Sequence, residues 1–386
     1  MLPEAFIELL QASTGQAEAV AKALEEAPSV SIRLNPAKLT ECPFPDAVQV
    51  PWSPYGYLLK ERPVFTLDPL FHAGCYYVQD TSAMYVGHVF RQVSAQLQPG
   101  CRVLDLCAAP GGKTTDLAAS LRERFGDRFS LVANEVMKNR FSTLRSNVET
   151  WGDTRVETVS RDPSAFGEEP IFDAILADVP CSGEGMFRKD AQAVAEWSLK
   201  TVEFCAARSR RILSDIWPTL VPGGILIYST CTFNHFENDD TVAWIASELG
   251  ADVLPLPAFP PVVNTRFGQL LLPGLVPGEG QYVAALRKHG GDAKCTTAPQ
   301  RTWESPEPGG KRTPVRSEDT ASPLVNVDRK TALHYLHGDA IFLPQDAPLG
   351  PVTIGYQGHP LGPAKNLGKR CNNLYPKNKR IRMDIR

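Results

Sequence analysis

Five short apolar runs separated by helix-length segments occupy the middle of the chain. The segments between them carry helical periodicity, most clearly over Lys113–Arg124 and Lys138–Trp151. Strands that alternate with helices favour right-handed βαβ crossovers, because parallel neighbours need a long connection. The sequence therefore predicts an α/β fold with a mostly parallel, doubly wound sheet. The five predicted strands are Arg102–Leu106, Leu131–Ala133, Val156–Val159, Phe172–Ala177 and Gly224–Ser229.

Smaller elements are predicted on both sides of this segment. Two short helices and the strand Val30–Leu34 predict a small α+β module over residues 1–70, and the alternation of apolar and polar residues predicts that the strand is half-buried. After the parallel strands, Leu270–Leu272 and Tyr282–Leu286 fit an antiparallel hairpin at the sheet edge. We therefore expect the main domain to span residues 71–290.

The last hundred residues begin with a change in composition. Glycine, proline, serine and threonine with mixed charge predict a linker over residues 291–323. Structure is expected to resume over residues 324–386, with a short helix around Thr331–Leu336 and strands at Ala340–Leu343 and Pro351–Tyr356. We expect this segment to form a separate small domain.

Charge is distributed unevenly along the 386 residues. The chain holds 40 Lys and Arg against 43 Asp and Glu, a net charge of −3 that by itself argues against a polyanionic partner. Residues 365–386, however, contain eight basic residues and one acid, a local charge of +7 that leaves −10 for residues 1–364. This asymmetry favours a nucleic-acid partner.

Several protein classes are excluded by composition and cysteine spacing. No segment approaches the roughly 20 apolar residues of a membrane span, and the first residues lack the features of a signal peptide. The nine cysteines are odd in number, scattered, and never spaced Cys-x-x-Cys, which indicates neither a disulfide framework nor a zinc site. We expect a cytoplasmic chain with reduced thiols, no metal and no membrane association.

The turn after the first predicted parallel strand carries an unusual sequence, Asp-Leu-Cys-Ala-Ala-Pro-Gly-Gly-Lys at Asp105–Lys113. Small residues and paired glycines let a ligand approach the backbone, and the next helix offers free N–H groups. The segment matches neither the dinucleotide fingerprint nor the phosphate-binding loop of nucleotide hydrolases. An ordinary tight turn would explain the glycines but not the whole segment.

Acidic residues follow the next two predicted strands. Glu135 follows the second strand, where a carboxylate can accept hydrogen bonds from both hydroxyls of a ribose. Asp162 follows the third strand, where an acid can meet the exocyclic amine of an adenine. A solvated acid at a strand end is the competing interpretation in both cases.

Two cysteines follow the fourth and fifth predicted strands. Cys181 lies in the segment Asp178–Lys189 and Cys231 in the segment Tyr228–Thr232. A single free cysteine is usually a small buried apolar residue. Two cysteines at matched strand ends, one beside an acid, instead favour thiol chemistry in one cleft. A helix start or a cation such as Lys113 would lower a thiol pKa from about 8.5.

Three of these motifs together resemble the Nol1/Nop2/Sun family of RNA cytosine-5 methyltransferases: Pro-Gly-Gly-Lys-Thr, Asp-Val-Pro-Cys-Ser-Gly and Ser-Thr-Cys-Thr. The C-terminal segment, from Ile354–Gly362 through Asn372–Pro376, resembles the PUA-like RNA-binding module of the bacterial ribosomal RNA methyltransferase F branch. Further similarity lies in Ser31–Pro36 and His72–Met84. The resemblance covers nearly the whole chain except the linker.

The resemblance implies a Rossmann-like class I methyltransferase domain that methylates C5 of a specific cytidine, in 16S ribosomal RNA or the small ribosomal subunit. It implies that Cys231 adds to C6 of the base, Asp178 holds and protonates N3, and Lys113 lies near the base. Cys181 would help to release the product. DNA cytosine methyltransferases use the cysteine of a Pro-Cys pair, which would favour Cys181, but their glycine loop and the residues after Pro-Cys differ from those here.

The resemblance also implies S-adenosyl-L-methionine as the cofactor, and a C-terminal PUA-like β-rich domain that contacts RNA. Transfer RNA is the rival substrate. A non-catalytic RNA-binding ribosome-assembly factor and a methyltransferase for small molecules or proteins are two competing hypotheses of function. We expect a monomer. The cofactor-binding residues implied by the resemblance are Cys107, Ala108, Ala109, Pro110, Gly111, Gly112, Lys113, Glu135, Asp162 and Asp178.

Overall fold

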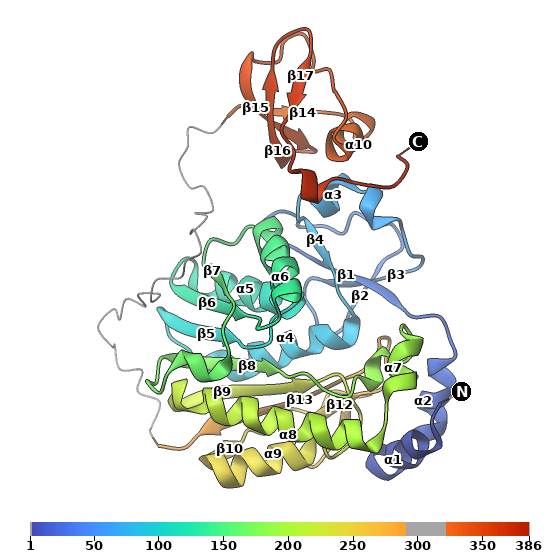
Figure 1. The fold of residues 1–386 in the computed structure, drawn as a ribbon, viewed down its shortest axis with the longest axis vertical. Coiled ribbons are helices and arrows are strands. Elements are labelled where there is room, and N and C mark those ends of the chain that lie inside the picture. Colours follow the sequence, from blue (N-terminus) through green and yellow to red (C-terminus); the bar gives the residue numbers. More distant parts are fainter. Residues whose placement is uncertain (1, 291–321, 386) are drawn as a thin grey trace.

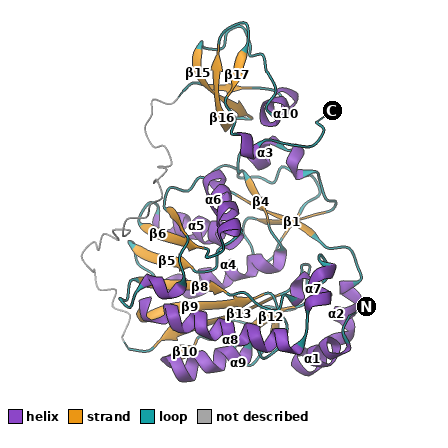
Figure 2. Cartoon of the chain, in the orientation of Figure 1, coloured by secondary structure: helices purple, strands orange, loops and turns teal. Residues whose placement is uncertain are grey.

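The computed structural model describes residues 2–290 and 322–385, and within them the chain forms three β-sheets (Figures 1 and 2). The four-stranded sheet formed near the N-terminus lies between the large central sheet and a second four-stranded sheet at the C-terminus. The predicted linker, residues 291–323, lies almost entirely outside the described residues.

The central sheet has nine strands in the order β11-β12-β13-β9-β8-β5-β6-β7, with β10 also paired to β13. Its parallel part confirms the predicted α/β fold. The five parallel strands are β5 (Cys101–Asp105), β6 (Phe129–Asn134), β7 (Val156–Val159), β8 (Phe172–Asp178) and β9 (Leu220–Thr230). The antiparallel strands are β10 (Ala251–Val253), β11 (Val263–Asn264), β12 (Gln269–Leu271) and β13 (Gln281–Lys288).

Helices cover both faces of this sheet, as a doubly wound fold requires. One face packs in a core with α4 (Thr81–Val93) and α5 (Gly112–Phe125), and the opposite face packs with α8 (Leu199–Ile216). Alternate residues of β8 divide between the two cores, with Ile175 in one and Leu176 in the other. This alternation follows from the two-residue period of a strand. The remaining helices of the domain are α6 (Lys138–Trp151), α7 (Ala191–Glu196) and α9 (Asp239–Trp244).

The predicted hairpin forms, but it does not end the sheet. β12 and β13 pair antiparallel, and β13 also pairs with β9 along six residues. β13 therefore lies inside the sheet, with its first six residues buried, and β11 forms the edge. This insertion brings the start of β13 to the carboxyl ends of the parallel strands.

The N-terminal segment does not form one compact α+β module. Helices α1 (Glu4–Thr14) and α2 (Ala17–Leu24) join the core of the central domain, where Phe6 packs against Trp197 at 5.6 Å between ring centroids. The strands form a separate sheet in the order β2-β3-β1-β4. Their bounds are β1 (Val30–Leu34), β2 (Val48–Gln49), β3 (Gly56–Leu59) and β4 (Tyr76–Val78), the last of which lies beyond the expected boundary at residue 70.

The prediction that strand β1 is half-buried was wrong. Its polar residues Ser31 and Arg33 are 3% and 0% exposed, because this face of the N-terminal sheet packs against the central domain. The apolar residues Ile32 and Leu34 point to the other face, where they join a core shared with the C-terminal domain. Both faces of the strand are therefore covered.

The C-terminal domain is a four-stranded sheet with one helix. Its elements are β14 (Leu324–Asn326), α10 (Arg329–His337), β15 (Gly350–Tyr356), β16 (His359–Asn366) and β17 (Cys371–Asn373). The strand predicted at Ala340–Leu343 is absent, since only Ile341 makes an isolated bridge, to Cys371. The domain packs on α3 (Pro69–His72) of the N-terminal region, and Lys379 forms an ion pair with Glu149 of α6 at 3.3 Å.

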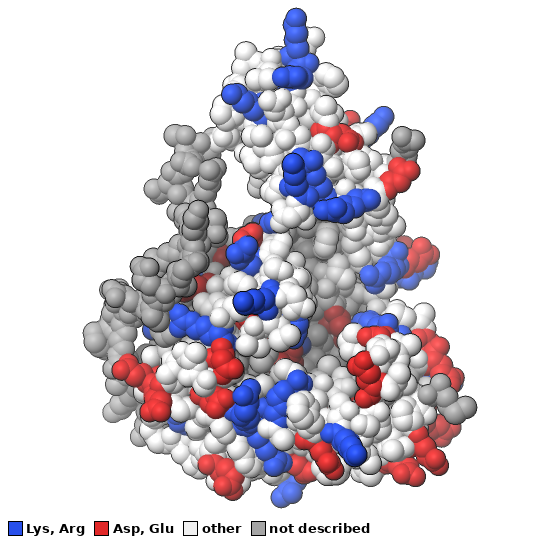
Figure 3. Space-filling model, in the orientation of Figure 1, with Lys and Arg blue, Asp and Glu red and all other residues white. Residues whose placement is uncertain are grey.

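Much of the basic C-terminal segment is folded. Lys365 lies in β16, and Ile381 is buried, with its backbone N–H donating to the carbonyl of Leu336 at 3.0 Å. Lys369, Arg370, Lys377 and Arg382 are exposed. Figure 3 shows Lys and Arg side chains projecting from the C-terminal domain. The positive charge is therefore displayed by a packed domain.

We expect Ile381→Ala to destabilise the C-terminal domain by about 2–5 kcal/mol, since it removes a buried branched side chain. Hydrogen exchange of the β15 and β16 amides would measure the loss, because a chain of several domains need not unfold in one step. Met383→Ala, two residues away and 41% exposed, is the control and should change exchange little. Equal protection in the two variants would contradict the packing role of Ile381.

Candidate active site

The carboxyl ends of β8 and β9 bring the two predicted cysteines together. Asp178 is the last residue of β8 and lies opposite Ser229 of β9 in the parallel ladder. Cys181 follows three residues after Asp178, and Cys231 follows directly after β9. Their sulfur atoms are 3.3 Å apart. Residues separated by 50 positions in the chain thus form one thiol pair.

The Asp178 carboxylate is held at both of its oxygens. Lys113 Nζ, from the first turn of α5, lies 2.9 Å from Oδ2. Ser229 Oγ donates to Oδ1 at 3.0 Å, and Gln281 Nε2 donates to the same oxygen at 3.2 Å. These contacts fix the orientation of a carboxylate that is still 26% exposed on the side of the site.

Lys113 carries its charge despite its surroundings. Burial acts to lower the pKa of this lysine, but attraction to Asp178, with smaller contributions from Cys231 and Asp105, raises it overall. The side chain is 16% exposed. Lys113 is therefore a protonated cation paired with Asp178 at neutral pH.

The surroundings of Cys181 disfavour its thiolate form. The pKa of Cys181 is raised well above the ordinary range, first by its hydrogen bond with Cys231 and then by burial. The expectation that a nearby cation lowers a thiol pKa does not apply to Cys181. This thiol holds its proton at neutral pH.

The loop after β8 is fixed by backbone and carboxylate contacts. Gly185 N–H donates to the carbonyl of Cys231 at 2.7 Å, and a Cβ at Gly185 would lie 2.9 Å from that oxygen. Glu237 accepts from the N–H of Ser182 at 2.9 Å and from its hydroxyl at 2.5 Å. Glu184 accepts from Phe233 N–H at 2.6 Å. The Cys181 loop and the segment after Cys231 are thereby held together.

Both of these glutamates are buried. Glu184 is 1% exposed and Glu237 is 0% exposed. Burial raises the pKa of Glu237 to about 7. Glu184, Glu237 and Gln281 were all missed in the sequence. Glu184 lies within the Cys181 motif, which was a usable signal, whereas Glu237 and Gln281 stand in no recognised motif.

The turn between β5 and α5 is a second part of the site. Gly111 adopts φ = +110°, which favours glycine, and the backbone enters α5 at Gly112. Asn147 Nδ2 donates to the carbonyl of Pro110 at 2.8 Å, and Arg140 donates to that of Ala109 at 2.8 Å. The turn is thus braced by α6 on one side.

Buried acidic groups lie beside this turn. Asp105 accepts from Thr114 Oγ1 at 2.6 Å through Oδ2, while its Oδ1 has no hydrogen-bond partner among the described residues. Burial raises the pKa of Asp105 to about 7 and also raises that of Cys107. Glu135, 3% exposed, accepts from Met137 N–H at 2.9 Å and lies 3.4 Å from Arg140.

Asp162 differs from the other predicted acids. It is exposed and caps the short helix Pro163–Phe166, accepting from the N–H and hydroxyl of Ser164 at 3.1 and 2.8 Å. These hydrogen bonds lower its pKa. Direct contacts therefore form two pairs at the ends of β8 and β9, Lys113 with Asp178 and Cys181 with Cys231. The charge of Cys231 acts on the pKa of Lys113, so we treat the four residues as one cluster. Glu135 and Asp162 lie outside it.

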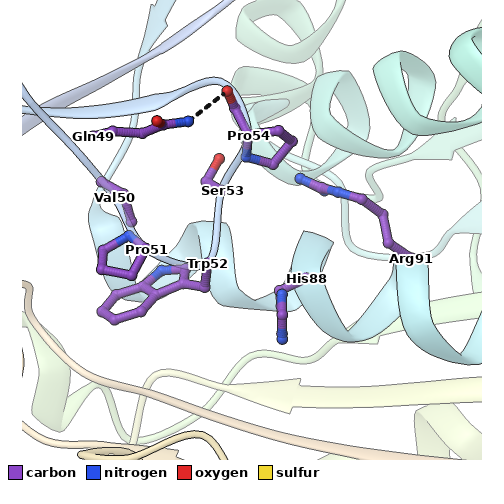
Figure 4. Close-up of a pocket in the computed structure, with 8 residues that line it drawn as sticks. All are labelled: Gln49, Val50, Pro51, Trp52, Ser53, Pro54, His88 and Arg91. Carbon is purple, nitrogen blue, oxygen red and sulfur yellow. Dashed lines mark hydrogen bonds between the residues drawn. The ribbon is translucent and has the colours of Figure 1, made fainter.

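A cavity of about 460 Å³ lies elsewhere, between the N-terminal sheet and α4 (Figure 4). It contains none of the predicted site residues. The cavity is lined by the segment from Gln49 to Pro54, which includes Trp52, and by His88 and Arg91 of α4. In the described part of the chain there is no cluster of His, Cys, Asp and Glu that could hold a metal ion, and no helix long and apolar enough to cross a membrane.

Comparison with protein families gives three matches along the chain. The family described as 16S rRNA methyltransferase RsmB/F matches residues 93–287. The N-terminal domain of 16S rRNA methyltransferase RsmF matches residues 2–81, and the methyltransferase RsmF PUA domain matches residues 322–381. The resemblance drawn from the motifs is confirmed.

Individual proteins are similar over large parts of the chain. Ribosomal RNA small subunit methyltransferase F of Aeromonas salmonicida is 29% identical over 90% of both chains. The protein of the same name from Cronobacter sakazakii is 34% identical over 74% of this chain and 63% of that protein, so the chain spans less than two thirds of this relative. A crystal structure described as a methyltransferase homolog protein from Pyrococcus horikoshii superimposes with a TM-score of 0.60 and 27% identity, covering 74% of this chain and 100% of that chain.

The family match over residues 93–287 includes half of the chain and the whole cluster around the thiol pair. The matched segment contains Lys113, Asp178 and both cysteines. With this segment and the two flanking domains matched in order, the chain belongs to the 16S rRNA methyltransferase RsmB/F family.

Proposed function

We propose that this chain is an S-adenosyl-L-methionine-dependent RNA (cytosine-5)-methyltransferase that acts on a cytidine of 16S ribosomal RNA. The observation that carries the proposal is the thiol pair at 3.3 Å beside the Lys113–Asp178 ion pair. An RNA-binding assembly factor without activity would need neither the thiols nor the ion pair.

The proposed reaction begins with Cys231. The Cys231 thiol gives up its proton as its sulfur bonds to C6 of the cytosine, which makes C5 nucleophilic. Asp178 holds N3 and relays one proton to it, so the charge that develops in the ring is balanced. Lys113, on the other oxygen of Asp178, keeps that carboxylate in place. When bound, the cofactor supplies an electrophilic methyl group for C5. Loss of the C5 proton then lets the bond between sulfur and C6 break.

Cys181 is assigned to the release step. Its raised pKa keeps a proton on the sulfur at neutral pH, 3.3 Å from Cys231. Its position beside Cys231 supports a role in the departure of the product.

The turn from Cys107 to Lys113 with Glu135 and Asp162 is the proposed cofactor site. Buried Glu135 follows β6, where it can accept from ribose hydroxyls, and exposed Asp162 follows β7. The positive φ of Gly111 and the N-terminus of α5 open the backbone to a ligand. The unpaired oxygen of buried Asp105 leaves a hydrogen-bonding position open beside this turn.

The C-terminal domain, residues 324–386, is the proposed RNA contact. Its exposed lysines and arginines support phosphate binding, and a paired cytidine must leave its helix before a thiol reaches C6. We infer a cytoplasmic monomer. Transfer RNA is the second candidate substrate, and the match of residues 322–381 to the RsmF PUA domain supports ribosomal RNA over it.

Replacing each cysteine tests the proposed mechanism. Cys231→Ala should abolish methyl transfer and form no covalent RNA adduct. Cys181→Ala should be impaired in release and retain a covalent adduct with RNA on denaturing gels. Cys205→Ala, a buried cysteine on α8, is the control and should keep activity. Methyl transfer by the Cys231→Ala variant would overturn the assignment.

The RNA contact is tested by neutralising exposed charges. Deleting residues 365–386 would also remove β17 and the end of β16, so point substitutions are preferable. We expect Lys369→Gln, Arg370→Gln and Lys377→Gln together to weaken RNA binding and to lower its salt slope by about one for each lost phosphate contact. Cofactor affinity should not change.

The control for that experiment is Arg128→Gln. Arg128 is exposed and directly precedes β6. It therefore lies at the amino ends of the parallel strands, whereas the thiols lie at their carboxyl ends. It should leave both RNA affinity and its salt dependence unchanged. Equal RNA affinity of the triple variant and the wild type would contradict the proposed contact.

A further inference from the structure

Arg33 is a completely buried cation that belongs to the N-terminal sheet but bonds to the turn after β5. It is the fourth of the five residues of β1 and is 0% exposed. Burying a guanidinium is unfavourable unless hydrogen bonds and opposite charge compensate for lost water. Its partners therefore indicate what the charge stabilises.

Most of these partners lie at the start of α5. Nη2 of Arg33 donates to the carbonyl of Gly112 at 3.0 Å and to Oγ1 of Thr115 at 2.5 Å. The carboxylate of Asp116, also at the start of α5, lies 3.9 Å from Nε. Burial lowers the pKa of Arg33 and Asp116 counteracts this effect. The guanidinium thus binds the backbone and side chains of one helical turn.

Other contacts of Arg33 make its position rigid. Nε donates to Oε1 of Gln79 at 2.7 Å, and the guanidinium stacks over the ring of Trp151 at 4.7 Å from its centroid. Gln79 follows β4 and Trp151 ends α6, so three separate elements surround the group. A planar guanidinium held on several sides has little rotational freedom to lose.

A second residue of the same sheet supports the other side of the turn. Tyr77 of β4 donates through its hydroxyl to the carbonyl of Pro110 at 3.2 Å, and Asn147 donates to that hydroxyl at 3.3 Å. A Cβ at Gly112 would lie 3.3 Å from the Tyr77 ring. The N-terminal sheet therefore backs the turn from Pro110 to Thr115 along its length.

We propose that Arg33 is a positioning residue for cofactor binding, which acts by fixing the Gly111–Thr115 turn from the N-terminal sheet. The inference rests on the proposed function, because it takes this turn as part of the cofactor site. Arg33 touches neither the thiol pair nor Asp178. Its removal should therefore weaken the affinity for S-adenosyl-L-methionine and leave the affinity for RNA unchanged.

The test is calorimetric binding of S-adenosyl-L-methionine to the purified chain and its variants. We expect Arg33→Gln to weaken binding about 10-fold and the isosteric Thr115→Val to weaken it about 3-fold, since buried hydrogen bonds to the turn are lost. The double variant should bind more weakly than either single variant but by less than the product of their effects, because both substitutions remove the Arg33–Thr115 hydrogen bond and each also removes contacts of its own. In steady state, the KM for the cofactor should rise while the KM for RNA stays constant.

Thr219→Val is the matched control. Thr219 is equally buried, and its hydroxyl donates to the carbonyl of Ile216 at 2.7 Å. It directly precedes β9, at the amino end of that strand and away from the cofactor turn. It should lower thermal stability to a similar extent as Thr115→Val without changing cofactor affinity. If Arg33→Gln does not fold, Thr115→Val against this control decides the question.

Two outcomes would overturn the inference in different ways. Wild-type cofactor affinity in both turn variants would show that Arg33 is a structural residue of the domain junction only, and would leave the proposed function intact. A wild-type chain that binds no S-adenosyl-L-methionine at all would overturn the proposed function and this inference with it.

Discussion

The parallel ladder between β8 and β9 is the constraint on which the site depends. Asp178 and Ser229 are opposite each other in this ladder, and the backbone hydrogen bonds of both strands continue to these residues. The two cysteines leave the ladder within three residues of its end. Their separation is therefore set by strand register and by the short turns that follow, and a loop of independent conformation plays no part.

Buried polar groups outside the reacting cluster make those turns rigid. Glu184 and Glu237 accept hydrogen bonds from both turns, and Gly185 lets the backbone of the first turn approach Cys231 closely. The N-terminal sheet performs the same task for the turn before α5 through Arg33. Hydrogen-bonded buried polar groups specify a single arrangement, because each lost bond leaves an unpaired group in an apolar medium.

The sequence predicted the parts of the structure that depend on local pattern. The parallel strands were predictable from apolar runs between helical segments, and the convergence of both cysteines followed from the common direction of those strands. The periodicity of an amphipathic helix or strand does not show which other element will pack against it. Thus α1 was correctly expected as a helix but packs against Trp197, away from the strands that follow it. Likewise, the polar face of β1 was expected in solvent, yet it meets another domain. Gln281 was missed because β13 enters the sheet from a distant part of the chain.

The shared core of the N-terminal sheet and the C-terminal domain has a consequence for synthesis of the chain. Ile32 and Leu34 of β1 pack in one cluster with Leu333 and Ile354, which are translated about 300 residues later. At a translation rate of about 5–20 residues per second, the C-terminal residues that cover the apolar face of that sheet are synthesised roughly 15–60 s after β1. During this interval the nascent chain lacks the C-terminal part of this core, so these apolar side chains stay uncovered until the last domain emerges.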